Sequence, residues 1–318
     1  MGGHVNYGLK HPLPVRMKVC DVLDLIGNTP VVKLRKIVPK DGAQIYAKLE
    51  WYNIGGSVKD RAALYMFEAA ESSGLLTKDK TIIEATSGNT GIALAMIGAV
   101  KGYKVTIVMS ESASVERRRI VKAYGADLIL TPADKGTAGA IEYKERLVRE
   151  NPNHYISLDQ FSNPANVLAH YMGTGREILD QMDGKVDMVV MSVGTGGTSN
   201  GVARRLRDYL ENVRIVGVTP AKGVRIEGIR NPKEPNPSKL VNLSILDELV
   251  EITDEKKSQC FETGRRCARE EGLLIGMSSS CALHVALEKS ILLGPDKRIL
   301  VIFPDNGYKY LSTDLFRQ

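Results

Sequence analysis

Several patterns that would define a class of protein are missing from this 318-residue chain. The chain has four cysteines, Cys20, Cys260, Cys267 and Cys281. They show neither a CxxC pair nor a cysteine–histidine spacing, so the sequence indicates neither a metal site nor a disulfide framework. No apolar run approaches the length of a membrane span, and the amino-terminal segment lacks the apolar stretch of a secretory signal. We therefore expect a cytoplasmic protein that binds no membrane.

Charge of one sign is not concentrated anywhere in the sequence. The 43 basic and 37 acidic residues give a net charge of +6, and they are dispersed along the chain. The densest basic clusters, Arg117 to Arg119 and Arg204 to Arg207, fall in segments with helical periodicity. Solvated helix faces explain such clusters better than a nucleic-acid site does, so we expect no nucleic-acid partner.

What the chain does have is an alternation of short β-branched runs with amphipathic segments of helical period. This pattern is typical of an α/β protein with mostly parallel sheets flanked by helices. Strands are expected at 43–50, 81–85, 104–109, 127–131, 154–158, 186–193, 214–219 and 298–303. Helices are expected at 57–73, 90–101, 114–124, 137–150, 164–182, 200–210, 254–271 and 280–292. The length favours two lobes over one.

One lysine follows a glycine turn at a predicted helix start. In the segment Asn53 to Arg61, the Ser57 hydroxyl is placed to cap the helix and Lys59 falls in its first turn. The helix dipole disfavours a cation there, and burial would lower the pKa of the amine further. A neutral amine can attack an aldehyde such as that of pyridoxal phosphate. The alternative is a surface lysine balanced by Asp60.

Three loops at predicted helix starts carry polar groups. The segment Thr86 to Gly91 presents hydroxyls, an amide and backbone N–H groups, which suit a carboxylate. The segment Gly194 to Thr198 follows an apolar strand and suits a phosphate. It is neither a Walker loop nor a dinucleotide fingerprint, because Ser199 occupies the third glycine position of the latter. The serine run 278–280 alone would be read as a helix cap.

Together these segments resemble the fold type II pyridoxal-phosphate enzymes, tryptophan synthase β-like in fold, and within them the cysteine synthases. The resemblance runs from Ile26 to Gly307. It implies that Lys59 holds the cofactor as an internal aldimine and that Asn89 bonds the pyridine 3′-oxygen. The loop implied to hold the cofactor phosphate consists of Gly194, Thr195, Gly196, Gly197 and Thr198. The residues implied to hold the substrate carboxylate are Thr86, Ser87, Thr90 and Gln160.

The resemblance also assigns a serine to the pyridine nitrogen. That serine corresponds to Ser278, but Ser280 stands where the family has glycine, so Ser279 stays an alternative. A hydroxyl does not hold the ring nitrogen protonated as a carboxylate would, which favours elimination and replacement at Cβ over transamination.

Arg230 narrows the expected substrate. It stands where phosphoserine-using members of the family carry arginine and acetylserine-using members commonly carry a small residue. A guanidinium offers a two-pronged donor to a phosphate leaving group and little to an acetyl ester. An interlobe salt bridge or a solvated side chain is the alternative for Arg230.

The resemblance thus implies a cysteine synthase closest to the O-phosphoserine sulfhydrylases. O-acetylserine sulfhydrylase, cystathionine β-synthase and serine dehydratase are alternative enzymes of the same fold. Alternatives from other functional classes are a non-catalytic binding scaffold that retains the fold and a nucleotide-dependent oxidoreductase. The sulfur donor would be sulfide or a thiocarboxylated carrier protein, and the enzyme a homodimer. Residues 42–158 are expected to form a smaller mobile lobe, and 1–41 plus 159–318 a larger cofactor-binding lobe.

Overall fold

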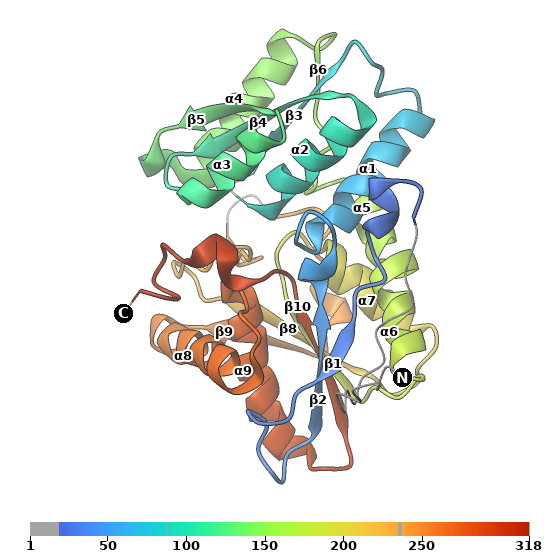
Figure 1. The fold of residues 1–318 in the computed structure, drawn as a ribbon, viewed down its shortest axis with the longest axis vertical. Coiled ribbons are helices and arrows are strands. Elements are labelled where there is room, and N and C mark those ends of the chain that lie inside the picture. Colours follow the sequence, from blue (N-terminus) through green and yellow to red (C-terminus); the bar gives the residue numbers. More distant parts are fainter. Residues whose placement is uncertain (1–18, 87, 235–236, 318) are drawn as a thin grey trace, which may run out of the picture.

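The computed structural model describes residues 19–86, 88–234 and 237–317. Their strands form two sheets, one of six strands and one of four. Figure 1 shows the four-stranded sheet in the upper part of the molecule and the six-stranded sheet below it, each covered by helices. No helix of the described residues is both long enough and apolar enough to span a bilayer.

The six-stranded sheet has the order β1-β2-β10-β7-β8-β9. Its strands are β1 (Val31–Lys33), β2 (Gln44–Leu49), β7 (Met188–Ser192), β8 (Arg214–Pro220), β9 (Glu248–Ile252) and β10 (Arg298–Phe303). Only β1 and β2 pair antiparallel, and the other neighbours are parallel. The central strands are apolar on both faces, as parallel strands buried between helices must be.

Helices cover both faces of this sheet. They are α5 (Pro164–Ala169), α6 (Gly175–Gln181), α7 (Gly197–Arg207), α8 (Asp254–Glu271) and α9 (Met277–Leu293). Alternate residues of one strand point to opposite faces. Met188 and Val190 of β7 therefore pack in the core that includes α8 and α9, whereas Val189 and Met191 pack with α6 and α7.

The four-stranded sheet is parallel throughout, in the order β5-β4-β3-β6. Its strands are β3 (Thr81–Ala85), β4 (Lys104–Ser110), β5 (Asp127–Thr131) and β6 (Tyr155–Ile156). Its helices are α1 (Lys59–Ser72), α2 (Asn89–Lys101), α3 (Val115–Ala123) and α4 (Gly136–Glu150). Residues of α1, α2 and α3 pack in one core, and α4 covers the other face through Ala140 and Leu147.

Short helical turns complete the described chain. The 3-10 turns are η1 (Val22–Leu25), η2 (Glu50–Tyr52), η3 (Ala133–Lys135), η5 (Leu243–Ile245) and η6 (Gly307–Tyr310). A π-helical turn, η4 (His170–Thr174), joins α5 to α6, so the single helix predicted at 164–182 contains an irregular turn. Ser278, Ser279 and Ser280 lie in the first turn of α9 rather than in the loop that we expected.

The sheets do not divide at the residue where we expected the lobe boundary. The strand β2 lies within the predicted smaller lobe of residues 42–158, yet it pairs with β1 and β10 in the six-stranded sheet. The four-stranded sheet is built from residues between Thr81 and Ile156. A mobile smaller lobe stays a prediction, and its sheet begins with β3.

Candidate active site

The predicted site residues gather where helices begin beside the carboxyl ends of parallel strands. The helix α2 follows β3, and α7 follows β7. The turn before α1 lies against the segment that follows β10, since Val58 N donates to Pro304 O at 2.9 Å and Ser57 pairs with Asp305. Open α/β sheets bind their ligands at this edge.

Lys59 is the first residue of α1 and is half-buried. The N-cap of α1 is Val58 and not, as we expected, Ser57, although the backbone N–H of Lys59 donates to the Ser57 hydroxyl at 3.2 Å. Burial lowers the pKa of the Lys59 amine, and the negative charges of Asp305, Asp60 and Glu50 oppose this shift. The amine therefore gives up its proton more readily than an exposed lysine does.

A buried ion cluster holds α1 in place behind the lysine. Arg61 contacts Glu50 at 2.7 Å and Glu177 at 2.6 Å, and Lys48 contacts Glu177 at 2.7 Å. Although burial opposes ionisation of Glu177, the hydrogen bonds and charges of Arg61 and Lys48 lower its pKa to about 2. Breaking such a buried pair typically costs about 3–5 kcal/mol, so the cluster fixes the start of α1.

The Asn89 side chain lies between two charged residues of the C-terminal segment. Its amide nitrogen donates to Asp305 Oδ2 at 2.8 Å, and its oxygen accepts a hydrogen bond from Lys309 Nζ at 2.8 Å. Lys309 Nζ also donates to Gly56 O at 3.0 Å, in the turn before Lys59. The structure thus brings Asn89 and the lysine turn together through Lys309.

The loop Gly194 to Thr198 forms the start of α7 and is closely packed. Gly196 has a φ of +90°, which favours glycine, and a Cβ there would come within 2.8 Å of the Val241 backbone. A Cβ on Gly194 would lie 3.1 Å from Gly228 O, and one on Gly197 would collide with the Asn166 side chain. Only glycines fit against these neighbours. The loop they form is a helix N-terminus, where N–H groups and the dipole favour an anion. The loop therefore fits a phosphate.

Two buried residues outside the predicted site support this loop. Asn166 Nδ2 donates to Thr195 Oγ1 at 3.1 Å and to Gln160 O at 2.9 Å. The ring of His170 lies 3.2 Å from Thr198 Oγ1 through Nε2 and 2.9 Å from Thr174 Oγ1 through Nδ1. Burial, with the positive charges of Lys59 and Arg61, lowers the pKa of His170 to about 3, so its ring is neutral.

The residues expected at the substrate carboxylate come from the start of α2 and from the segment after β6. Thr90 Oγ1 donates to Gln160 Oε1 at 2.6 Å, and both side chains are buried. Thr86 Oγ1 accepts from Gly88 N at 3.2 Å. Ser87 lies outside the described residues. Because Asn166 bonds both Gln160 and Thr195, the carboxylate set and the phosphate loop are directly connected.

The hydrogen bonds of the serine run favour Ser278 over Ser279 as the residue that faces a ligand. The Ser279 hydroxyl donates to Asp305 O at 3.2 Å, and that of Ser280 donates to Gly276 O at 2.9 Å. No described residue accepts or donates a hydrogen bond at the Ser278 hydroxyl, which is buried. A Cβ on Gly228 would lie 3.7 Å from Ser278 Oγ, so Ser278 adjoins the loop that carries Arg230.

Arg230 is half-buried at the end of that loop. Its N–H donates to Val193 O at 3.4 Å, directly before the phosphate loop, and its carbonyl accepts from Thr219 Oγ1 at 3.1 Å. These backbone contacts place Arg230 beside the predicted phosphate loop. Its role toward a substrate stays a prediction.

Sequence reasoning missed several residues of the site, and for Arg117 the expectation was wrong. Arg117 is buried rather than solvated. It pairs with Glu227, and its guanidinium lies 4.8 Å from the centre of the Tyr310 ring. Asp305 lies within the span of the family resemblance, but no pattern in the sequence connects it or Lys309 to Asn89, more than 200 positions away.

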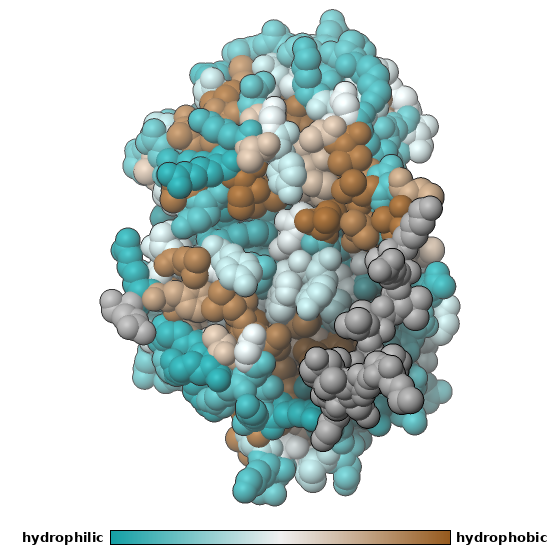
Figure 2. Space-filling view, in the orientation of Figure 1, coloured by the Kyte–Doolittle hydropathy of each residue, from teal (hydrophilic) through white to brown (hydrophobic). Residues whose placement is uncertain are grey.

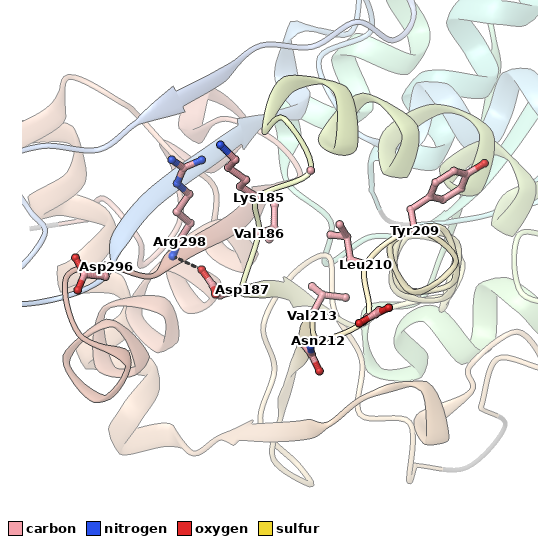
Figure 3. Close-up of a pocket in the computed structure, with 11 residues that line it drawn as sticks. Lys185, Val186, Asp187, Tyr209, Leu210, Asn212, Val213, Asp296 and Arg298 are labelled. Atoms are coloured by element: carbon pink, nitrogen blue, oxygen red, sulfur yellow. Dashed lines mark hydrogen bonds between the residues drawn. The ribbon is translucent and has the colours of Figure 1, made fainter.

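A depression of about 520 Å³ lies elsewhere on the molecule, at the amino ends of β7, β8 and β10. Figure 3 shows Asp187, Leu210, Val213 and Arg298 around it. The Asp187 carboxylate accepts hydrogen bonds from Lys297 Nζ and from the backbone N–H of Arg298. This end of a parallel sheet lacks the helix N-termini that bind anions, so we do not assign the depression to catalysis.

Comparisons with known proteins agree with this geometry. The family described as "Pyridoxal-phosphate dependent enzyme" matches residues 22–305. A cysteine synthase of Staphylococcus aureus is 42% identical over 310 residues, covering 94% of this chain and 97% of that protein. The structure of a hydrogen sulfide-producing enzyme from Fusobacterium nucleatum has a TM-score of 0.86 and 40% identity, covering 92% of this chain and 100% of that one. O-Acetyl Serine Sulfhydrylase isoform 3 from Entamoeba histolytica has a TM-score of 0.86 and 37% identity, covering 98% and 95%.

The chain belongs to the pyridoxal-phosphate-dependent enzymes, and within them to the cysteine synthase family. This membership confirms the predicted fold class, the cofactor pyridoxal phosphate and an enzymatic β-replacement that makes cysteine. The glycine-lined start of α7 and the amine of Lys59 with its lowered pKa fit that cofactor.

Proposed function

We propose that the protein replaces the phosphate of O-phospho-L-serine with a sulfur nucleophile, giving L-cysteine. The choice of ester depends on Arg230. It lies half-buried beside the phosphate loop, two residues after Gly228, which adjoins Ser278. A guanidinium there offers parallel N–H donors to a departing phosphate dianion, whereas an acetyl ester has no charge to recognise.

The residues of the site have distinct roles in this proposal. The loop 194–198 binds the cofactor phosphate, Lys59 holds the cofactor covalently, and Asn89 and Ser278 contact its ring. Thr86, Ser87, Thr90 and Gln160 bind the substrate carboxylate. Pyridoxal phosphate, when bound, would accept the electron pair of the Cα–H bond as the proton leaves.

The chain's own groups then move the proton and orient the leaving group. Once the substrate's amine has taken the place of Lys59 on the cofactor, the released Lys59 Nζ accepts the Cα proton, which its lowered pKa favours by making the neutral amine more accessible. Arg230 binds the phosphate as the Cβ–O bond breaks. The sulfur of the donor then bonds to Cβ, and Lys59 returns the proton to Cα. The sulfur donor is free sulfide or a thiocarboxylated carrier protein. The reaction takes place in the cytoplasm.

Replacing Arg230 tests the ester. Arg230→Ala should lose more kcat/KM with O-phosphoserine than with O-acetylserine, by tenfold or more, since a charge-assisted hydrogen bond contributes about 1.5–3 kcal/mol. Arg225→Ala, an exposed arginine of the same loop, is the matched control and should change neither value. Equal losses with the two esters would show that Arg230 supports the loop and does not recognise phosphate.

O-acetylserine is the second candidate ester. The observation that favours it is the structural similarity to the Entamoeba histolytica protein, whose name states that substrate. Equal losses in Arg230→Ala, together with a higher kcat/KM of the parent for O-acetylserine, would make this the better assignment.

We further infer a homodimer. Figure 2 shows hydrophobic residues gathered over α1 and the neighbouring turn η1, where Val22 is 47% exposed. Apolar surface of this kind is typical of a subunit contact. Sedimentation equilibrium would test it, because a mass of one chain at micromolar concentration would contradict the inference.

A further inference from the structure

The C-terminal segment Asp305 to Ser312 bridges the two sheets at the site. It follows β10 of the six-stranded sheet, and in Figure 1 it runs as the red trace beneath α3. The Ser114 hydroxyl donates to Lys309 O at 3.4 Å, and the Ser312 hydroxyl donates to Glu116 Oε2 at 3.1 Å. The segment therefore touches α3 of the smaller sheet while its side chains reach Asn89.

Lys309 is an unusual residue within this segment because it is only 6% exposed. Among the described residues no carboxylate forms a direct ion pair with it, and its ammonium donates to the uncharged oxygens Gly56 O and Asn89 Oδ1. Burying an ammonium is costly unless its donors are used. An apolar side chain would fill this space without the cost of burying an ammonium. Packing alone therefore does not explain why a lysine stands here, and the two hydrogen bonds point to a further role.

The two contacts of Asn89 decide the orientation of its amide. Asp305 accepts from the nitrogen, and Lys309 donates to the oxygen. Rotating the amide by half a turn would point its N–H groups at an ammonium and its oxygen at a carboxylate. Both contacts would then be repulsive, so only one orientation is stable. The amide nitrogen carries two hydrogens, and Asp305 accepts one of them.

Asp305 is itself held in position. The Tyr310 hydroxyl donates to the same oxygen, Oδ2, at 2.7 Å, and Tyr310 is fully buried beneath the guanidinium of Arg117. Lys309 and Asp305 are four positions apart on one segment, so they bracket the amide of Asn89 from a single rigid support.

We propose that Lys309 is a positioning residue that fixes the Asn89 amide with its second N–H directed at the 3′-oxygen of bound pyridoxal phosphate. This inference rests on the role proposed above for Asn89. Lys309 acts through Asn89 and does not itself touch the cofactor. Without Lys309 only Asp305 opposes rotation of the amide, so the rotated form, which presents its oxygen to the 3′-oxygen where two acceptors repel, is disfavoured less strongly.

A double-mutant cycle on cofactor affinity tests the inference. The dissociation constant of pyridoxal phosphate and the visible absorption of the bound cofactor are measured for Asn89→Ala, Lys309→Met and the double variant. Lys309→Met keeps the aliphatic stem and should weaken binding on the order of tenfold, with a changed absorption band. Lys309→Arg keeps the charge and should restore both readouts. The double variant should bind no more weakly than Asn89→Ala alone.

Lys289→Met is the control for losing a half-buried lysine. Lys289 bonds Glu248 at 2.5 Å and lies roughly 16 Å along α9 from Ser278, so both readouts should keep the parental values.

Additive losses in the double variant would overturn the inference, because Lys309 would then act independently of Asn89. Failure of Lys309→Met and Lys309→Gln to fold would also overturn it, since Lys309 would then be structural. Unchanged values in Asn89→Ala alone would instead refute the role assigned to Asn89.

Discussion

At the scale of single residues, burial changes the protonation of side chains around the site. It lowers the pKa of Lys59, and it raises the pKa of Asp60 to about 7. Glu84, which is fully buried at the end of β3, is affected in the same way. Its Oε2 accepts from Asp159 N at 3.0 Å and from the Ser157 hydroxyl at 3.3 Å, and no described residue bonds Oε1.

The pH dependence of stability should reveal this carboxyl. Burial raises the pKa of Glu84 to about 7 from an ordinary 4.5, with Lys144 opposing the shift. Between these values the folded state binds more protons than the unfolded chain, so the stability falls as the pH rises and stays low above 7. Glu84→Gln removes this titration. The difference in the free energy of unfolding, variant minus parent, should therefore increase by on the order of 2–4 kcal/mol from pH 4 to pH 8.

Urea unfolding of the apoprotein at the two pH values measures this gain. Glu68→Gln, which changes an exposed glutamate of α1, should show the parental pH dependence. A constant difference between Glu84→Gln and the parent at all pH values would mean that Glu84 has the same pKa in the folded and unfolded states, and the burial argument would fail.

Most residues of the candidate site could be proposed from the sequence because they lie in short contiguous motifs. Lys59, Asn89 and the loop 194–198 each follow a glycine-containing turn and open a helix. Lys309 could not, since its contact with Asn89 depends on how the chain returns beneath α3 after β10. Nor could the choice of Ser278 over Ser279, which depends on the hydroxyl of Ser279 bonding Asp305 O.

At the scale of elements, the start of α7 depends on the helical segment that precedes β7. The side chain of Asn166, in α5, occupies the space beside Gly197 and bonds both Gln160 and Thr195. The turn η4 carries His170 to Thr198. A π-helical turn of this kind often occurs at functional sites, and helical periodicity alone gives no sign of it.

Replacing Gly197 should therefore disturb the site through Asn166. In Gly197→Ala the new Cβ would collide with the Asn166 amide, so either the start of α7 or Asn166 must move. We expect pyridoxal phosphate to bind more weakly by tenfold or more, measured by titration of the apoprotein. Ser199→Ala, in the same turn of α7, adds no volume and should bind within about threefold of the parent. Parental affinity in Gly197→Ala would contradict the tight packing of this loop.

The elements that sequence reasoning missed are short. The strands β1 and β9 have three and five residues and contain charged side chains, so their alternation is weak. The longer strands and helices were predicted to within a few residues because their apolar periodicity extends over whole turns or over buried runs.

At the scale of the whole molecule, the alternation of strands and helices predicts an α/β protein but not how the strands divide between two sheets. The strand β2 lies before the first strand of the smaller sheet in sequence, and yet it pairs with β10, which lies at the other end of the chain. Long-range pairing of this kind leaves no local pattern. It places the turn before Lys59 against the segment after β10, where the two sheets meet.

The most direct test of the account is to locate the amine that holds the cofactor. The holoenzyme is reduced with borohydride and digested, and the labelled peptide is identified by mass spectrometry. The account predicts the label on Lys59 alone and none on the Lys59→Ala variant. Lys309 is the informative competitor, because burial lowers its pKa as well and it bonds the carbonyl of Gly56 in the turn before Lys59. A label on Lys309, or on any lysine other than Lys59, would contradict the account.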